Sequence, residues 1–492
     1  MNRRFSYLLG ILMLSGLLLN HSPKAYGQLS GSNLAEFQYG NIPGEKPANL
    51  SALYDQLNLS FRQKNIFLKT KIESFQPSFS KNRSYTKISQ FSAQYSDKGF
   101  KIQLGSLYQT IGRGLLLRNY EQPSSIWEGR GYRVKYGFFK DLQGLAASYT
   151  KDNFQIKLLR GRVLAVDLPP TLDNLERRPD LIEGGEGNYT VKGQTIGLAF
   201  MRHTNDERTD SYATAYVDGY LKSISYYAEY AFGGNNARAA YGGINFFSGS
   251  FGISLEYKNY NNFLIGAGIN DPPTLIKEHS SRLLNRSTHV PILTNESGYQ
   301  TEVSYQFKNS SIISFNHSGA SNKIGEDLSF TFREYYIDYE IHAGQNWYGK
   351  IFADFSQDPF NAENQRYTGG IILEREIHSV TAGLDLEMQK VNRDFGEIQE
   401  FSNYYTSLNI SKGSKMGISL VLELSNDPFL IEEGKEFIAY PGVILSYQPV
   451  HSTSLSLFAG KRRGGPACNS GVCYDVLDFE GIELRITTNF NN

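Results

Sequence analysis

Two stretches of this chain decide its fold: residues 380–388 read VTAGLDLEM, and residues 416–425 read MGISLVLELS. In both, apolar residues alternate with polar or small ones, so every second side chain points to the same face of an extended backbone. Leu420 and Leu422, for example, share a face opposite Glu423. This period of two predicts amphipathic strands of roughly 9–12 residues rather than helices.

The same alternation recurs along most of the chain and predicts an all-β protein, a single antiparallel up-and-down transmembrane barrel of about 24 strands within a range of 22–26. An even number suits a single-chain bacterial barrel with both ends in the periplasm. The predicted strands lie near 33–40, 52–62, 65–75, 84–96, 99–108, 131–138, 143–150, 153–166, 190–203, 210–220, 222–232, 238–247, 250–259, 297–307, 311–319, 326–341, 344–356, 363–376, 378–391, 398–411, 415–426, 435–447, 452–461 and 474–490.

The connections between these strands alternate between short and long, and this distinguishes a membrane barrel from a soluble sandwich. Outer-membrane barrels have short periplasmic turns, longer extracellular loops, and strands of about 9–11 residues. The long connections are expected near 109–130, 260–296, 426–434 and 462–473. Residues 167–188 break the pattern, as a long connection on the periplasmic side; either it is real or a hairpin is missed there.

The composition excludes several classes of protein. The chain has 492 residues, 40% apolar and 20% charged, and a mean hydropathy of -0.39, which excludes a multi-span helical membrane protein. Its 49 basic and 49 acidic residues argue against a nucleic-acid partner. Its 33 Tyr, 31 Phe and 47 Gly suit many strands with one wet face and not a disordered chain.

The start of the chain predicts export. Arg3 and Arg4 precede an apolar run over residues 5–19, and a small-x-small pattern ends at Gly27. We interpret residues 1–27 as a cleaved Sec signal peptide, the alternative being an uncleaved anchor. Residues 28–492 then form one barrel domain in the outer membrane of a Gram-negative bacterium.

The two cysteines lie close together in a segment rich in glycine. Export to an oxidising compartment predicts a disulfide between Cys468 and Cys473. Metal binding is the alternative, but two ligands alone make a weak site. We expect no metal site, no bound cofactor and no catalytic residue. His279 beside Ser280 and Ser281 is the one neighbourhood that an outer-membrane enzyme could use, and no acidic orienting partner stands out.

The last predicted strand carries an assembly signal. Gly481, Leu484, Ile486 and Phe490 resemble the motif read by the barrel-assembly machinery, although Asn491 and Asn492 follow the aromatic residue. The expected partners are therefore outer-membrane lipid, the barrel-assembly machinery and possible envelope proteins.

A barrel of this size would leak if its lumen were empty, so we expect its long loops to fold inward. Two alternatives stay open for the cations on these loops. They could line a constriction that favours anions, or they could pair with acidic residues of the lumen and hold the loops in place. The candidate residues are Arg113, Arg118, Arg130, Lys277, His279, Arg282 and Arg286.

Three segments carry a resemblance to a known family. They are residues 107–121, residues 272–289, and residues 460–481 with their two cysteines. Together they resemble an uncharacterised family of outer-membrane barrels from the Bacteroidota, which carries a domain-of-unknown-function label. Tyr474 departs from that pattern, where a basic residue often follows the second cysteine. The resemblance implies a barrel and an outer-membrane location over nearly the whole mature chain, and no substrate.

Two functions remain in competition. The first is a channel or gated pore for small solutes with inward-folded loops. The second is a non-conducting barrel that serves as scaffold or accessory of an envelope machine, for example type IX secretion, or as a surface-display protein. An outer-membrane enzyme is a third and weaker alternative.

Overall fold

The computed structural model describes most of the chain. Its described residues are 27–41, 50–78, 83–129, 133–164, 177–266, 269–273, 275–289, 295–324, 328–344, 346–431, 433–469 and 472–491, with the side chains of 124, 164, 177–179, 324 and 466–475 excepted.

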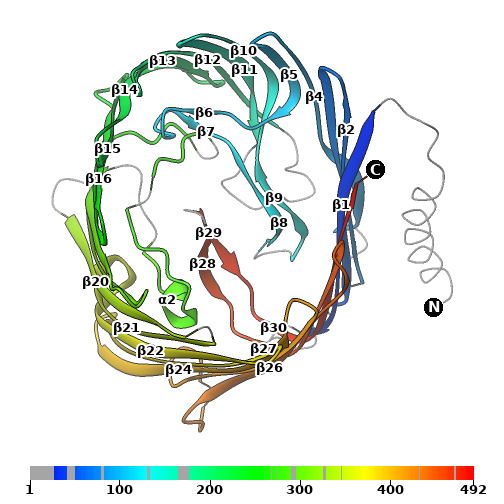
Figure 1. Cartoon of the computed structure of the whole chain (residues 1–492), viewed down its shortest axis with the longest axis vertical. Helices are drawn as coiled ribbons and strands as arrows, with labels where there is room; N and C mark the ends of the chain where they lie inside the picture. Colours follow the sequence, from blue (N-terminus) through cyan, green and yellow to red (C-terminus); the bar gives the residue numbers. More distant parts are fainter. Residues whose placement is uncertain are drawn as a thin grey trace.

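The wall of the molecule is a closed antiparallel barrel of 24 strands (Figure 1). Neighbouring strands in the chain pair with one another, and β1 pairs with β30 to close the ring. The predicted fold class and strand number are therefore confirmed. The wall strands are β1 (Gln28–Asn41), β2 (Ala52–Gln63), β3 (Ile66–Pro77), β4 (Tyr85–Asp97), β5 (Phe100–Leu107), β10 (Leu142–Lys151), β11 (Phe154–Leu164), β12 (Arg177–Val191), β13 (Gln194–Thr204), β14 (Thr209–Leu221), β15 (Ile224–Gly233), β16 (Arg238–Ser248), β17 (Phe251–Asn261), β18 (Asn295–Gln306), β19 (Ile312–Ile324), β20 (Leu328–Ala343), β21 (Trp347–Asp358), β22 (Glu363–Ile377), β23 (Val380–Asp394), β24 (Ile398–Lys412), β25 (Met416–Ser425), β26 (Ile438–Val450), β27 (Thr453–Arg462) and β30 (Phe479–Asn491).

Further elements lie inside the ring, as Figure 1 shows down the barrel axis. Among the described residues they form three antiparallel ribbons, which pair β6 with β7, β8 with β9 and β28 with β29, and one short helix, α2. A single 3-10 turn, η2 (Pro359–Asn361), joins β21 to β22. The inner elements are β6 (Thr110–Ile111), β7 (Leu117–Arg118), β8 (Tyr120–Glu128), β9 (Lys135–Lys140), α2 (Arg282–Arg286), β28 (Gly465–Asn469) and β29 (Val472–Val476).

The strand predicted at 131–138 is not part of the wall, so that prediction was wrong in its placement. The sequence there forms β9, which pairs with β8 inside the barrel, while β5 pairs directly with β10. All residues from Val134 to Phe139 are buried on both faces of the ribbon. Alternation alone cannot distinguish such an inner strand from a wall strand, because both are extended.

For residues 167–188 the two alternatives are a long periplasmic connection and a missed hairpin; residues 177–188 form neither and belong to one wall strand, β12, while residues 167–176 lie outside the described residues. This strand pairs with β11 and β13. Its sequence, RRPDLIEGGEGNYTV, contains a proline and three glycines, which read as breakers and hide the alternation. Leu164, the last residue of β11, is the register partner of Arg177, the first residue of β12. The prediction counted one wall strand too many, at 131–138, and missed one, β12, so the predicted total of 24 was still correct.

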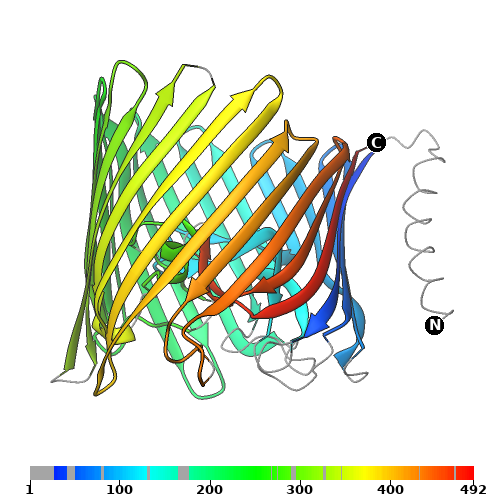
Figure 2. The same ribbon diagram turned by 90° about the horizontal axis from the view of Figure 1, so that it is seen from below.

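The two ends of the barrel differ. At the end that carries the start of β1 and the C-terminus (Figure 2), the turns are short, such as residues 98–99 and 192–193. Lys98 and Gly99 both have positive φ (46° and 83°), as do Lys192 and Gly193 (49° and 76°). Two successive positive φ values are typical of type I′ hairpins, whose twist matches that of the strands. The long segments all lie at the other end.

The exterior of the wall is apolar and has aromatic residues toward both ends. Exposed Ile, Leu, Val and Phe side chains occur on strands all around the ring. Near the short-turn end, Phe100 lies opposite Tyr149, and Phe154 opposite Tyr189. Near the long-loop end, Tyr299 lies opposite Tyr257. An apolar band between two aromatic girdles is typical of barrels in a membrane.

Glycines bend the wall where the chain leaves it after β5 and returns to it at β10. Gly105, Gly144 and Gly161 are register partners on β5, β10 and β11. Gly105 has a φ of 94°, and a Cβ there would lie 2.1 Å from the Phe91 carbonyl oxygen. Only glycine fits this close approach of two backbones, which bends the sheet just before the chain turns inward at Leu107.

Within the described part of the chain, none of the helices has the length and apolar character that a membrane-crossing helix requires.

Candidate functional site: the lumen and its plug

Three segments of the long-loop end fold into the lumen. We call their described residues together the plug. They are the β6–β9 segment (residues 108–141), the α2 segment (262–289) and the β28–β29 segment (463–478). Each begins and ends at a wall strand, so the plug is built from the barrel's own connections. The prediction of inward-folded loops is confirmed for the described residues of the two loops that carry the candidate cations, near 109–130 and 260–296 (Figure 1).

The β6–β9 segment is held by glutamates on the inner face of the wall. Glu229 on β15 accepts a hydrogen bond from the Arg113 backbone N at 2.8 Å, and Glu186 on β12 accepts one from the Gly112 backbone N at 3.2 Å. Lys135 on β9 forms an ion pair with Glu36 of β1, with both side chains almost fully buried. Charged hydrogen bonds of this kind are stronger than neutral ones and fix the segment's position.

An apolar cluster also joins this segment to the wall. Ile111 and Leu115 to Leu117 are fully buried against inward-facing residues of β10 to β13, including Val163 and Met201. Phe263, Ile265 and Ile269 of the α2 segment belong to the same cluster. Part of the lumen is therefore a dry core and not a water-filled passage.

The helix α2 is capped by a wall carboxylate. Glu387 on β23 accepts hydrogen bonds from the backbone N of Arg282 and of Leu283, each at 2.7 Å. The first backbone N–H groups of a helix have no intrahelical partner, so this carboxylate satisfies two of them from across the lumen. His279, just before the helix, contacts Glu334 of β20 at 3.1 Å.

Three plug arginines converge on one wall carboxylate. Glu423 on β25 pairs with Arg286, with Arg463 at 3.1 Å, and with Arg282 at 3.9 Å. Arg286 also donates to the Arg463 carbonyl oxygen at 2.8 Å, which links the α2 and β28–β29 segments. Burial lowers the pKa of the Arg286 guanidinium to about 10; the neighbouring Arg282 and Arg463 lower it too, while Glu423 raises it.

The candidate cations from the sequence all lie in the plug where the structure describes them. Arg130 lies outside the described residues. Each of the others contacts the wall or another plug residue: Arg113 lies 4.7 Å from the Tyr227 ring centroid, Arg118 is 3.5 Å from Asp271, Lys277 is 2.5 Å from Glu302, His279 contacts Glu334, and Arg282 and Arg286 share Glu423. Lys277, His279, Arg282 and Arg286 contact acidic residues of the wall, which is the arrangement of the second alternative, whereas Arg113 contacts a tyrosine ring and Arg118 a carboxylate of the plug. The first alternative, an anion-selective constriction, stays a prediction.

The sequence reasoning missed two wall glutamates that hold the α2 segment: Glu423 pairs with its arginines, and Glu387 accepts hydrogen bonds from its backbone N–H groups. Glu387 and Glu423 stand on the polar side of the alternation in the two stretches that reveal the fold. The sequence does mark both glutamates as inward-facing, because each is an acidic residue within a predicted strand on the face opposite the apolar one. What the sequence could not supply was the partner, because Arg286 and Glu423 are 137 residues apart.

Asp271 is a plug residue whose charged form is disfavoured by burial. Burial raises the pKa of its carboxyl, while the nearby Lys140 and Arg118 lower it. Arg118 belongs to β7, so this contact ties the β6–β9 and α2 segments together. The two cations compensate the buried carboxylate incompletely, because the effect of burial is the larger one.

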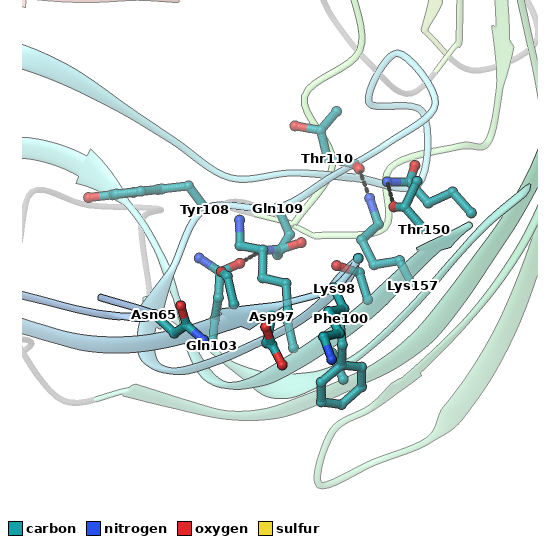
Figure 3. Close-up of a pocket in the computed structure, with 17 residues that line it drawn as sticks. Asn65, Asp97, Lys98, Phe100, Gln103, Tyr108, Gln109, Thr110, Thr150 and Lys157 are labelled. Carbon is teal, nitrogen blue, oxygen red and sulfur yellow. Dashed lines mark hydrogen bonds between the residues drawn. The ribbon is translucent and has the colours of Figure 1, made fainter. Parts of the chain in front are cut away.

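Two polar cavities lie beside the plug, with volumes of about 740 and 930 Å³. Both are lined by Gln103 and Tyr108 (Figure 3). Gln109 donates to Gln103 at 3.1 Å, and Lys157 donates to the Thr110 carbonyl oxygen at 2.7 Å (Figure 3). The larger cavity is lined by amide and hydroxyl side chains together with Lys69, Lys71, Glu121 and several aromatic rings, so it offers hydrogen-bond donors and acceptors beside apolar surface.

Two other predictions concern the cysteine pair of the β28–β29 ribbon and the C-terminal strand β30. The backbone register sets Cys468 opposite Cys473 in the β28–β29 ribbon, a spacing that a disulfide can bridge. Their side chains lie outside the described residues, so the disulfide stays a prediction. In β30, Phe490 lies opposite Gly31 and Leu484 opposite Phe37, at the closing seam of the barrel. Gly481 has a φ of 149°, and a Cβ there would lie 2.3 Å from the Tyr39 carbonyl oxygen.

Comparisons with known proteins give a family but no activity. A family model described as "Family of unknown function (DUF6029)" matches residues 7–490. A search of curated proteins finds no match. Among solved structures, the P pilus usher PapC translocation pore is 8% identical, with a TM-score of 0.43. The alignment covers 94% of this chain and 99% of the PapC chain. Pseudomonas aeruginosa OpdQ is 10% identical, with a TM-score of 0.41, over 70% of this chain and 96% of its own. No functional conclusion is taken from likenesses this distant.

Proposed function

We propose, from the premise that this chain belongs to the DUF6029 family of unknown function, that it is a gated channel for small solutes in the outer membrane of a Gram-negative bacterium. The apolar exterior between aromatic girdles supports the membrane location. The inward plug supports gating, since it can be displaced without breaking a pairing between wall strands.

The asymmetry of the two barrel ends supports an orientation. Outer-membrane barrels keep short turns in the periplasm and long loops outside. The end with the C-terminus would then face the periplasm, and the plug would enter from the outer side. In this proposal residues 1–27 are a Sec signal peptide, the C-terminal strand is read by the barrel-assembly machinery, and lipid covers the exterior.

The observation that carries the proposal is the way in which the plug is attached. Polar contacts to separate wall carboxylates, Glu229, Glu387 and Glu423 among them, hold most of it. Each such contact can break while the backbone ladder of its strand stays complete. A wall of 24 strands without its plug would be wide enough for a water-filled channel.

The proposal favours small uncharged polar solutes. Lys277, Arg282 and Arg286 contact wall carboxylates, which reduces the field that these cations offer to anions while the plug is docked. The larger cavity presents Ser32, Gln56, Asn58, Gln90 and Gln94 instead. We assign no catalytic activity to the protein.

Conductance in a planar bilayer tests the proposal. Arg462 and Phe479 are register partners, so residues 463–478 can be replaced by a short Gly-Ser turn without disturbing β27 or β30. The matched control replaces residues 426–437 between the register partners Ser425 and Ile438, at the same end of the barrel. We expect stable, larger current steps from the first variant, and wild-type behaviour from the control. Silence from all three proteins, each shown to be folded by heat-modifiable gel migration, would rule out a channel.

A second function is favoured by the dry core between plug and wall. The cluster around Leu115 and Met201 makes complete removal of the plug unfavourable, which suits a permanently sealed barrel. Such a barrel would be a scaffold or accessory of an envelope machine, for example type IX secretion, or a surface-display protein. Cross-linking in intact cells, followed by identification of envelope partners, would be the next measurement after a silent bilayer.

A further inference from the structure

Three side chains with metal-binding groups meet where the plug touches the wall. His279 comes from the α2 segment, Glu334 from β20 and Asp354 from β21. One ligand atom from each lies within 4.8 Å of the other two. Their side chains are 2%, 2% and 0% exposed, so the group is sealed from solvent. The three residues are 20 to 75 positions apart in sequence, which explains why no motif predicted them.

The polar atoms of this cluster are incompletely satisfied by the protein. Both carboxylate oxygens of Asp354, Oε2 of Glu334 and Nδ1 of His279 are buried without a hydrogen-bond partner among the described residues. A buried polar atom without a partner destabilises the folded state, and a charged one does so more strongly. Buried atoms of this kind therefore point to a bound ion or water that completes the site.

The local charges are also unbalanced. Four carboxylates, those of Glu334, Asp354, Asp358 and Glu363, lie around the guanidinium of Arg366, and Arg393 is a second cation near Glu363. Arg366 donates from Nη1 to Glu363 at 3.1 Å and to the Ser287 carbonyl oxygen at 2.5 Å. Its Nη2 stays 3.7 Å from Glu334 and 3.8 Å from Asp354, beyond hydrogen-bond distance. His289 contacts Asp358 at 2.8 Å.

The spacing of the ligands suits a small divalent cation. Imidazole nitrogen and carboxylate oxygen bind zinc at about 2.0–2.2 Å, so two ligands of a tetrahedral site lie about 3.3 Å apart. Nε2 of His279 and Oε1 of Glu334 are 3.1 Å apart, close to that distance. A cation would take the place of the proton that these two atoms share, and Asp354 would turn toward it.

We propose that His279, Glu334 and Asp354 form a binding site for a divalent transition metal, with zinc the best match to one imidazole and two carboxylates. The metal fastens the α2 segment to β20 and β21. Arg366 is its rival for the two carboxylates, and it balances the remaining acidic groups when the metal is bound. This proposal does not depend on whether the barrel conducts.

Calorimetric titration with zinc chloride tests the site directly. The barrel is purified without a histidine tag, stripped with a chelator, and shown to be folded by heat-modifiable migration. We expect one equivalent of zinc to bind the wild type, and its affinity to fall at least about 100-fold in Asp354→Asn and in His279→Gln. The matched control is Asp338→Asn, an inward carboxylate of β20 that pairs with Lys350 at 2.8 Å outside the cluster; its affinity should equal that of the wild type.

Two results would overturn the proposal. If the folded wild type binds no zinc, Arg366 already serves as the counter-ion of these carboxylates. If the wild type and all three variants bind zinc equally, the metal sits elsewhere. Cobalt chloride gives a second readout, because a tetrahedral His/carboxylate site produces visible absorption that should disappear in His279→Gln. Arg366→Gln removes the rival cation and should bind zinc more tightly than the wild type.

Discussion

The most informative perturbation of the plug is Glu423→Gln. The carboxylate of Glu423 is 5% exposed and lies between the guanidinium groups of Arg286 and Arg463, with Arg282 at the edge. The amide keeps the shape of the side chain and one acceptor oxygen; it removes the charge and replaces the second acceptor oxygen by an NH2 donor. The wall should be unaffected, since the ladders of β24, β25 and β26 use backbone groups alone.

The size of the effect follows from burial. Removing one partner of a buried ion pair costs about 3–5 kcal/mol, because the other charge is left uncompensated. Hydrogen bonds to charged groups are each worth about 1.5–3 kcal/mol, and the amide oxygen keeps part of this. Arg282 is 36% exposed and is screened by solvent, so its pair adds little. We expect a loss of about 3 kcal/mol in plug docking, which at 1.36 kcal/mol per factor of ten is about 150-fold in the opening equilibrium.

Hydrogen exchange measured by mass spectrometry reads this equilibrium segment by segment. Amides of α2 and of β28 should exchange about 150-fold faster in the variant, while peptides from β23 to β26 keep wild-type rates. The control is Glu400→Gln, which removes an exposed pair with Lys390 on the exterior and should change neither. Unchanged exchange in α2, or an equal increase in the wall strands, would refute the reasoning, because the carboxylate would then not hold the plug separately from the barrel.

Four further predictions follow from single features. Glu387→Gln leaves one acceptor for two backbone N–H groups of α2. The free energy of opening that hydrogen exchange reports for the α2 amides should therefore fall by about 1–3 kcal/mol, while that of β6–β9 stays unchanged. Burial raises the pKa of Asp271, so the folded state holds its proton more tightly than the unfolded chain does; the stability from this group then falls as pH rises above the ordinary value of 3.8, and thermal midpoints of Asp271→Asn should lose that decline. Gly105→Ala places a Cβ against the Phe91 carbonyl at a φ of 94° and should reduce the heat-modifiable folded fraction, whereas Gly187→Ala, with open space around its Cβ, should not. Thiol labelling of unreduced, denatured protein should find no free thiol if Cys468 and Cys473 are paired, and one in Cys468→Ser.

The wall could be predicted from sequence because its physics is local. Each wall strand has lipid-facing positions on one side, and alternation reports that directly, as in β23 and β25. β12 escaped because glycine and proline replace apolar residues in its sequence, while its neighbours β11 and β13 supply the pairing. Its strand state is imposed by partners on both sides, and a single segment cannot show that.

The plug could be predicted as inward loops but not as a docked structure. Its cations were visible, yet their partners lie on strands far away in the chain, as with Lys135 and Glu36 or Arg286 and Glu423. The inner ribbon β8–β9 resembled a wall strand because it too is extended, with one face on the wall and the other on the plug. Only the closure of the barrel decides which extended segments lie inside it.

The two kinds of contact between plug and wall imply an order of release. The β6–β9 segment packs Ile111 and Leu115 to Leu117 into a dry apolar cluster, and separating such surfaces in water is opposed over their whole area. The α2 helix and the β28–β29 segment depend mainly on carboxylates such as Glu387 and Glu423, whose loss is local. If the barrel opens, we therefore expect α2 and the β28–β29 ribbon to leave the lumen first, with the β6–β9 segment still docked. Faster exchange in β6–β9 than in α2 would contradict this order, and with it the idea that the charged contacts form the movable part of the plug.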